Sequence, residues 1–316
     1  MKAFHLTTHH FYRQSHHSLK IFSISDIHFS DQVSSKLLSA IAQLFRQHHP
    51  THILIVGDLI DYLQVIEQPS EKQRLLDWLA ELGQIAPTII GFGNHDFYRL
   101  ASTGFSRHWL IARPTKFFRE IRSLPGLHLL DNQAYQDDQL FVLGFTLPPA
   151  YYHATRPSFL SPKFEDQHLL IQEFQKLPTQ LRVNLPTTKL KFALVHSPLH
   201  LLEPTVTPLF AEYDYLLSGH LHRGITPPII NEIWPSTRGF ISPTRHLFPK
   251  NVRNTIRTNE DKLIINGAIT TLQKCTGPLR ILNGLFPAYI NLLEFSNQKK
   301  YVRKPYIKKE YLPIDY

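Results

Sequence analysis

The chain has 316 residues, 42% of them hydrophobic, and a formal net charge of +9 at pH 7, which suits an ordinary globular protein with a sizeable core. Cys275 is the only cysteine, so an intrachain disulfide and a cysteine-built zinc or iron–sulfur site are excluded, and a metal would need His, Asp, Glu or Asn ligands. The positive charge favours an anionic partner, such as nucleic acid, an acidic membrane face or a phosphorylated substrate.

The N-terminal segment has neither an apolar stretch nor a small-residue cleavage pattern, so we expect no secretory signal and a cytoplasmic location. No apolar run approaches the roughly 20 residues that a spanning helix needs. Residues 19–25 then predict a strand, and Ser30 and Asp31 are capping candidates for an amphipathic helix. Its apolar positions recur at helical spacing: Val33, Leu37, Leu38, Ile41, Leu44 and Phe45.

The same order repeats further along the chain. Residues 53–56 form a uniformly apolar strand pattern, and Ser70 with Gln73 indicates a capping box. Leu75, Leu76, Leu79 and Leu82 then follow at helical spacing, and Gly83 is expected to end this helix. Residues 88–92 predict a third strand. Uniformly apolar strands alternating with helices indicate a sheet that is covered on both faces.

The second half of the chain continues this pattern and then loses it. Strands are predicted at 139–145, 189–196 and 213–218, with a helix at 166–177. Residues 221–261 are rich in Pro, Gly, Arg and aromatic residues and predict a long loop or cap. Two short strands, 262–266 and 289–295, are expected to rejoin the sheet. After Ser296 the chain is basic and without periodicity, which predicts a solvated or peripheral tail.

Groups that can bind a metal follow five of the predicted strands, each directly after the strand ends. Because loops diverge at the carboxyl ends of strands in layered α/β folds, such groups can gather there into one site. Each motif alone is weak, since a Gly-Asp is commonly a turn and a single histidine is more often a core residue. Their combination is specific: Asp26-Ile-His28, Gly57-Asp58, Gly93-Asn94-His95-Asp96, His196 and Gly219-His220-Leu221-His222.

This combination resembles the calcineurin-like metallophosphoesterases, whose motifs are Asp-x-His, Gly-Asp, Gly-Asn-His-Asp/Glu, His and Gly-His-x-His. The resemblance implies an α/β fold, a four-layer α-β-β-α sandwich of two mixed sheets flanked by helices. The metallophosphoesterase domain is expected over residues 1–296, with the loop or cap at about 221–261 and a basic C-terminal tail at 297–316. Local forms such as Ser-Asp-Ile-His are most similar to a bacterial branch with lipid-directed phosphoesterases and UDP-2,3-diacylglucosamine pyrophosphatase-like enzymes.

The resemblance also implies a role for each motif residue. Asp58 would bridge two divalent metal ions, and a metal-bridging hydroxide would attack phosphorus in line, without a covalent enzyme intermediate. Asp26, His28 and His222 would bind one ion, and Asn94, His196 and His220 the other. Manganese is the expected metal, with iron or zinc as alternatives, because these ions suit sites rich in imidazole and oxygen ligands.

Three further residues carry predicted roles beside the ligands. His95 would donate a proton or hydrogen bond to the leaving oxygen, and Asp96 would orient His95 or cap a helix. Arg223 stands where the bacterial branch has glycine, and it is interpreted either as a clamp on a second phosphate or as a surface residue. Asp31 and Asp61 match no ligand position and are interpreted as turn or cap residues.

The sequence predicts the substrate less clearly than it predicts the metal ligands. Basic and aromatic residues after His222 fit an anionic lipid surface or single-stranded nucleic acid, or are ordinary core and surface residues. They are Arg238, Arg245, His246, Lys250, Arg253 and Arg257, with Trp234, Phe240 and Phe248, and the apolar stretch within 277–293. A phosphorylated substrate is the expected partner, with peripheral contact to the inner membrane face. Nucleic acid is less favoured, and no obligate protein partner is evident.

Three functional hypotheses follow. The favoured one is a hydrolase of a phosphodiester or pyrophosphate in a lipid-linked or nucleotide-linked substrate. A nuclease of the same superfamily would need a DNA-binding domain after the last motif, for which the remaining chain is short. A non-catalytic scaffold would be expected to lack some ligands, and this chain lacks none.

Overall fold

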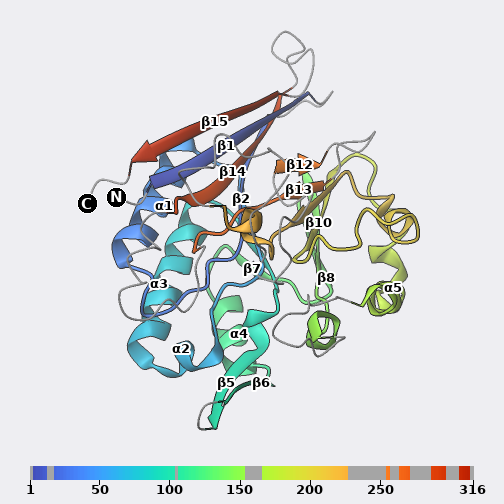
Figure 1. Cartoon of the computed structure of the whole chain (residues 1–316). Helices are drawn as coiled ribbons and strands as arrows, with labels where there is room; N and C mark the ends of the chain where they lie inside the picture. Colours follow the sequence, from blue (N-terminus) through green and yellow to red (C-terminus); the bar gives the residue numbers. More distant parts are fainter. Residues whose placement is uncertain are drawn as a thin grey trace.

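In the computed structural model, two β-sheets face each other and helices cover their outer faces (Figure 1). The structure describes residues 3–12, 18–103, 106–153, 166–226, 254–256, 263–270, 286–296 and 306–313. Among these residues, no helix is both long and apolar enough to cross a bilayer.

The first sheet has seven strands in the order β15-β1-β14-β2-β3-β4-β7. Strands β2, β3, β4 and β7 run parallel, and β14 joins β2 antiparallel but β1 parallel. The predicted strands 19–25, 53–56 and 88–92 lie side by side in it. The strand bounds are β1 Ala3–Tyr12, β2 Leu19–Ile24, β3 His52–Val56, β4 Thr88–Gly91, β7 Leu127–Leu129, β14 Ala288–Ser296 and β15 Tyr306–Pro313.

The second sheet has six strands in the order β12-β13-β11-β10-β9-β8. Its central strands β9, β10, β11 and β13 are parallel, and β8 and β12 pair antiparallel at the edges. The bounds are β8 Gln133–Gln136, β9 Leu140–Phe145, β10 Leu190–Val195, β11 Tyr215–Ser218, β12 Asn254–Ile256 and β13 Leu263–Ile265. All strands predicted in the second half of the chain are present. Four of them are β9, β10, β11 and β13 of this sheet, and the predicted strand 289–295 is β14 of the first sheet.

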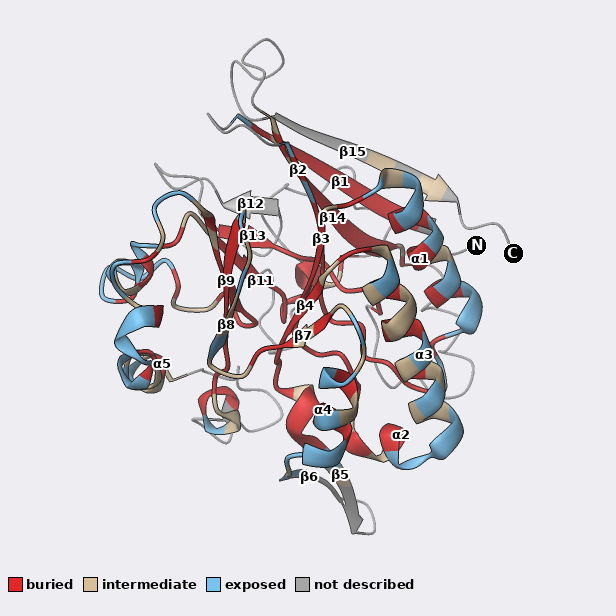
Figure 2. Ribbon diagram, turned by 180° about the vertical axis from the view of Figure 1, so that it is seen from behind, coloured by how far each residue is buried: buried red, intermediate tan, exposed pale blue. Residues whose placement is uncertain are grey.

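The buried side chains form three clusters, which correspond to the three interfaces of a four-layer sandwich. Successive residues of a strand point to opposite faces, so Leu54 and Val56 of β3 face the second sheet, whereas Ile53 and Ile55 face the helices. In β9, Val142 faces the first sheet in the same way. Figure 2 shows the inner strands of both sheets as buried, whereas the edge strand β8 is more exposed. The expected α-β-β-α sandwich is confirmed.

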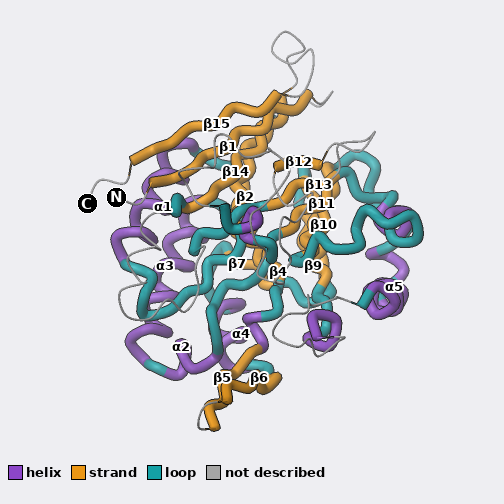
Figure 3. Tube along the Cα trace, viewed as in Figure 1, coloured by secondary structure: helices purple, strands orange, loops and turns teal. Residues whose placement is uncertain are grey.

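Four helices cover the first sheet and one covers the second in the described part of the chain (Figure 3). They are α1 Ser35–His48, α2 Leu63–Glu67, α3 Pro69–Ile85 and α4 Thr115–Arg122 on the first sheet, and α5 Gln167–Lys176 on the second. Single 3-10 turns occur at Pro149–His153, Thr179–Leu181 and Thr207–Phe210. The predicted helix at 166–177 is confirmed, and the Asp166 side chain caps it.

Three predicted helix boundaries were wrong. Helix α1 begins after Ser34, whose hydroxyl accepts the Leu37 N–H, so Ser30 and Asp31 do not cap it. Helix α3 begins at Pro69, with no side-chain cap, and the Gln73 amide donates to Asp77 instead of closing a capping box. Gly83 lies inside α3, next to Leu127 and Pro125, because a side chain there would collide with the loop before β7.

The two ends of the chain also differ from the prediction. No strand was predicted before residue 19, yet β1 lies inside the first sheet between β14 and β15. The tail contributes β15, which pairs with β1, so it is part of the fold. The apolar stretch before Ser296 is the buried strand β14 and not an exposed lipid contact. The basic and aromatic cluster from Trp234 to Arg253, with Arg257, lies outside the described residues.

Candidate metal centre

The predicted ligands come together where the carboxyl ends of strands from both sheets meet. Strands β2, β3 and β4 of the first sheet are followed by the segments with Asp26 and His28, with Asp58, and with Asn94. Strands β10 and β11 of the second sheet are followed by His196, His220 and His222. All seven side chains are buried, with at most 8% of each residue exposed.

One group of possible ligands consists of Asp26, His28 and His222, whose donor atoms lie within 4.8 Å of one another. The Nε2 atoms of His28 and His222 are 3.1 Å apart, and His222 Nε2 is 3.3 Å from Asp26 Oδ1. Two ring nitrogens and a carboxylate oxygen therefore point at a common position. This combination of imidazole and carboxylate donors is suited to a divalent cation.

A second group consists of Asp58, His196 and His220. His196 Nε2 is 3.1 Å from Asp58 Oδ2, and the same Asp58 oxygen is 3.6 Å from His28 Nε2 of the first group. Asp58 thus lies between the two groups, as a bridging carboxylate must. The imidazole Nδ1 of His196 donates to the Val56 carbonyl oxygen at 2.8 Å, so Nε2 is the ring nitrogen that faces Asp58 and could bind a metal.

Asn94 provides a direct test of whether a metal fits. Its side-chain oxygen is buried and has no hydrogen-bond partner among the described residues, which would be costly unless a cation accepts its lone pairs. His196 Nε2 is likewise buried, with the Asp58 carboxylate at 3.1 Å as its polar neighbour. A set of His, Asp and Asn donors with such an orphaned Asn oxygen fits divalent transition metals.

Several ligand residues adopt an unusual backbone conformation. Asp26, His28, Asp58, His220 and His222 all have positive φ angles, between 46° and 65°, a region that residues other than glycine rarely occupy. Such strain persists only where the surrounding structure enforces it, and it clusters at functional sites. The sequence carries no signal for this property.

Two of the glycines beside the ligands are required by close approach. Gly57 has a φ of +78°, and a β-carbon on it would lie 2.6 Å from His196 Nδ1. A β-carbon on Gly219 would overlap the Ser25 hydroxyl and lie 2.5 Å from Asp26 Oδ2. The loops of the two sheets can therefore pack together only if these positions have no side chain.

The electrostatics of the centre keep its two carboxylate ligands ionised. Burial opposes ionisation of Asp26, but the neighbouring His222 and His196 outweigh it and lower its pKa to about 2. The pKa of Asp58 is also well below its usual range, because His196 and His95 counter the effect of burial. Burial and the nearby His95 lower the pKa of His28 to about 3, so that this ring is neutral and can act as a ligand.

His95 lies beside the ligands, in the 3-10 turn η1 His95–Phe97, with its ring edge-on to His28 at 4.7 Å. Its Nδ1 is 2.7 Å from the backbone oxygen of Asp61 and 3.4 Å from the Asp61 carboxylate. Burial opposes protonation, but the charges of Asp58 and Asp61 raise the pKa of His95. Asp61 was interpreted as a turn or cap residue, so its contact with His95 was missed.

Asp96 does not have the predicted position against the His95 ring, nor does it cap a helix. Its carboxylate accepts backbone N–H groups from Gly93 at 2.8 Å, Leu59 at 3.0 Å, Asp58 at 3.1 Å and Ile60 at 3.2 Å. It therefore ties the loop after β3 to the loop after β4. Burial and the charge of Asp58 raise its pKa to about 7, against the opposing effect of the backbone donors.

Arg223 is buried within the 3-10 turn η5 His222–Gly224, so its interpretation as a surface residue was wrong. Its guanidinium lies over the Tyr289 ring at 4.4 Å, and Nη1 is 3.2 Å from His5 Nδ1. These contacts hold the turn against β14 and β1. Contact of Arg223 with a substrate phosphate stays a prediction.

Comparisons with known proteins identify a family. A family model for calcineurin-like phosphoesterases matches residues 19–224. A zebrafish (Danio rerio) relative, a transmembrane protein with a metallophosphoesterase domain, is 32% identical over 88 residues, which cover 27% of this chain and 18% of that protein. The aligned part thus spans less than a fifth of the relative.

Two solved structures show weaker similarity. TT1561 of Thermus thermophilus aligns with a TM-score of 0.39 and 13% identity, over 64% of this chain and 82% of that one. The Pseudomonas putida nuclease MPE aligns with a TM-score of 0.27 and 12% identity, over 64% of this chain and 61% of that one.

Proposed function

Because the chain belongs to the calcineurin-like phosphoesterase family, it is a metal-dependent phosphoester hydrolase, and we propose that it works with two divalent ions. One ion would be held by Asp26, His28 and His222 and the other by Asn94, His196 and His220, with Asp58 shared. The observation that carries this proposal is the position of the Asp58 carboxylate between two converging groups of donors. Manganese remains the preferred metal.

When bound, two such ions supply an activated water and neutralise charge on the phosphoryl oxygens. The chain's own residues would orient the ligand loops and protonate the leaving oxygen. Asp61 fixes the His95 ring through its Nδ1–H, which leaves Nε2 as the atom that can serve the leaving oxygen. Asp96 keeps the segments with Asp58 and Asn94 at a fixed separation.

For the substrate, we propose a phosphodiester or pyrophosphate in a lipid-linked or nucleotide-linked molecule. The basic net charge supports an anionic substrate and peripheral contact with an anionic membrane. Nuclease activity is the alternative, since it is the same chemistry on a nucleic-acid diester. The non-catalytic scaffold is set aside because every ligand is present and buried. A cytoplasmic location stays a prediction.

The test is an activity screen paired with metal analysis. Protein purified without chelator should contain close to two equivalents of metal, and Asp58→Ala should lose this stoichiometry. With added Mn²⁺, the wild type should cleave bis(p-nitrophenyl) phosphate, a sugar-nucleotide pyrophosphate or a lipid-linked phosphodiester faster than p-nitrophenyl phosphate. A single equivalent of metal that survives in Asp58→Ala would refute the shared site. A preference for the monoester would refute the proposed substrate class.

A further inference from the structure

A two-stranded hairpin extends from the body of the protein directly after His95 (Figure 1). It consists of β5 Tyr98–Thr103 and β6 Ser106–Ile111, which form a sheet of their own. Its base is held to α2, where the Gln64 side chain bonds to both the N–H and the carbonyl of Leu100. Tyr98 lies edge-on to the His95 ring at 5.5 Å. The hairpin is therefore fixed relative to the metal centre.

The end of β6 exposes two aliphatic residues in succession. Leu110 is 52% exposed and Ile111 is 60% exposed, the highest values among large hydrophobic residues in the described part of the chain. Neighbouring residues of a strand point to opposite faces, so the described residues leave both faces open at this point. The other exposed large hydrophobics, Tyr12, Val183 and Leu202, are isolated in the sequence, as is normal for a surface.

Positive charge surrounds this aliphatic pair. The sequence from Tyr98 to Arg122 has six Arg or Lys residues and one Glu, so it contributes more than half of the chain's net charge of +9. Arg99, Arg113, Lys116 and Arg119 are all exposed. Arg99 pairs with Glu67 and Arg113 with Asp131, whereas Lys116 and Arg119 form no ion pair among the described residues. Lys116 and Arg119 are three positions apart in α4, which places them on one side of that helix.

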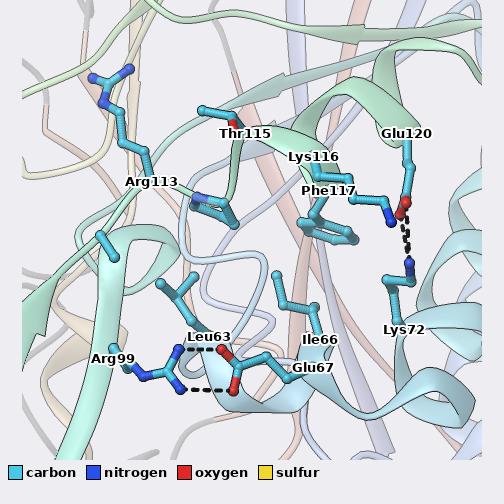
Figure 4. A pocket seen from close by; sticks show the side chains of 12 residues that line it. Leu63, Ile66, Glu67, Lys72, Arg99, Arg113, Thr115, Lys116, Phe117 and Glu120 are labelled. Carbon is cyan, nitrogen blue, oxygen red and sulfur yellow. Dashed lines mark hydrogen bonds and ion pairs between the residues drawn. The ribbon is translucent and has the colours of Figure 1, made fainter.

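A cavity of about 390 Å³ lies between the hairpin, α2 and α4. Figure 4 shows its apolar lining, Leu63, Ile66 and Phe117, between two ion pairs. Arg99 pairs with Glu67 at one end, with one contact at 3.2 Å, and Lys72 lies 3.0 Å from Glu120 at the other. The basic surface thus has an apolar recess behind it, of the size of small ligand pockets.

We propose that the base of the β5–β6 hairpin and the N-terminal part of α4 form a docking surface for an anionic lipid bilayer. With the edge of β6 toward the bilayer, Leu110 and Ile111 enter the headgroup region from the two faces of the ribbon, Lys116 and Arg119 contact lipid phosphates, and the recess receives part of an acyl chain. The inference deepens the proposed function, since an amphiphilic phosphoester would reach the metal centre from the surface next to His95.

The features of this surface favour a bilayer over other occupants. Nucleic acid would use the cations but gain nothing from exposed aliphatic side chains. A second copy of the chain, joined through the same patch, would place the two basic surfaces against each other, at an electrostatic cost. A bilayer with anionic lipids satisfies both the charge and the apolar pair.

Vesicle flotation at 50 to 500 mM salt provides the test, with phosphatidylcholine vesicles that either contain or lack phosphatidylglycerol. The wild type should bind only the anionic vesicles, and added salt should weaken binding. Lys116→Glu/Arg119→Glu should weaken it by roughly 30-fold or more, because each basic residue near such a surface contributes on the order of 1 kcal/mol. Leu110→Ser/Ile111→Ser should weaken binding even at low salt. Val183→Ser and Lys36→Glu, on other surfaces, should bind like the wild type.

The outcomes separate this inference from the proposed function. All variants should cleave a soluble diester at the wild-type rate, because no ligand is changed. If the wild-type protein cleaves the diester but does not bind vesicles, the docking surface is overturned and the proposed function stays intact. If it binds vesicles but does not cleave the diester, the proposed function is overturned and the docking surface stays intact. Unchanged binding of both double variants would also overturn the inference. So would a dimer that Leu110→Ser/Ile111→Ser dissociates, or tighter binding to an oligonucleotide than to anionic vesicles.

Discussion

Replacing Asp96 by Asn tests whether this residue holds the ligand loops or orients His95. The carboxylate accepts four backbone N–H groups, two on each oxygen: Gly93 and Asp58 on Oδ2, Leu59 and Ile60 on Oδ1. In either orientation of an amide, two of these donors face an NH2 group and lose their acceptor. Because Asp96 is only 2% exposed, water cannot replace the lost bonds.

The expected cost follows from these contacts. Each buried donor left without an acceptor costs about 1–3 kcal/mol, so Asp96→Asn should lower the free energy of unfolding by roughly 2–6 kcal/mol. The same change should weaken metal binding, since the lost contacts are either those of Gly93 and Asp58 or those of Leu59 and Ile60, which directly follow Asp58. Urea unfolding of the metal-free protein, followed by circular dichroism, measures the first effect, and titration with Mn²⁺ measures the second.

Glu81→Gln is the matched control. Glu81 pairs with Arg46 at 2.7 Å on the surface, and loss of an exposed ion pair costs at most about 1 kcal/mol. If Asp96→Asn unfolds within about 0.5 kcal/mol of the wild type, binds metal normally and loses only turnover, then Asp96 acts through His95 after all. That result would refute the structural role assigned to it.

Three further perturbations probe His95, the loop at Gly219 and the hydrogen bond between His52 and Asp137, which lies away from the metal centre. His95→Asn should keep the metal and lower turnover of a diester with a poor leaving group by roughly 10²–10⁴, with a smaller effect on an activated aryl ester; loss of metal would identify His95 as a ligand instead. Gly219→Ala should lower the metal content, because the added carbon would lie 2.5 Å from Asp26 Oδ2, and normal metal content by elemental analysis would contradict this packing argument. Asp137→Asn should lower the free energy of unfolding at pH 7 by about 1–2 kcal/mol, since Asp137 accepts from His52 at 2.7 Å and from the Leu140 N–H. Burial raises the pKa of Asp137, but these donors lower it overall, so its contribution is present above the unfolded value of about 4 and is lost as the pH falls through the folded value. Urea unfolding should therefore show a smaller difference in the free energy of unfolding between the wild type and Asp137→Asn at pH 3 than at pH 7. An equal difference at both pH values would contradict this reasoning.

The ligand set could be predicted from the sequence because it depends on local patterns. Each ligand motif closely follows a mostly apolar strand, and parallel strands bring their carboxyl ends to one edge. The strands themselves were recognisable, since a strand buried on both faces, such as β3, is apolar throughout. The clustering of these residues and most strands of both sheets needed no further information, whereas their roles as metal ligands stay a prediction that rests on the family resemblance.

Features that depend on distant contacts could not be predicted. Strand β1 has three histidines among its ten residues and no apolar run, and it is a strand because β14 and β15 pair with it. The direction of the Asp96 carboxylate depends on the turn η1, and it turns toward backbone donors after β3. The burial of Arg223 depends in the same way on Tyr289 and His5, which lie far away in the sequence.

The position of β1 between two C-terminal strands constrains when the protein can fold. His9 of β1 bonds to Asn291 of β14, which is 282 positions away. At 5–20 residues per second, a ribosome needs on the order of 15–55 s to synthesise that interval. During this time, β2 has no partner on its β14 side, and its open edge can pair with other chains. Strand β2, which precedes the ligands Asp26 and His28, therefore completes its pairing only late in synthesis. Loss of the C-terminal strands should impair folding of the metal centre, although all of its ligands lie before residue 223.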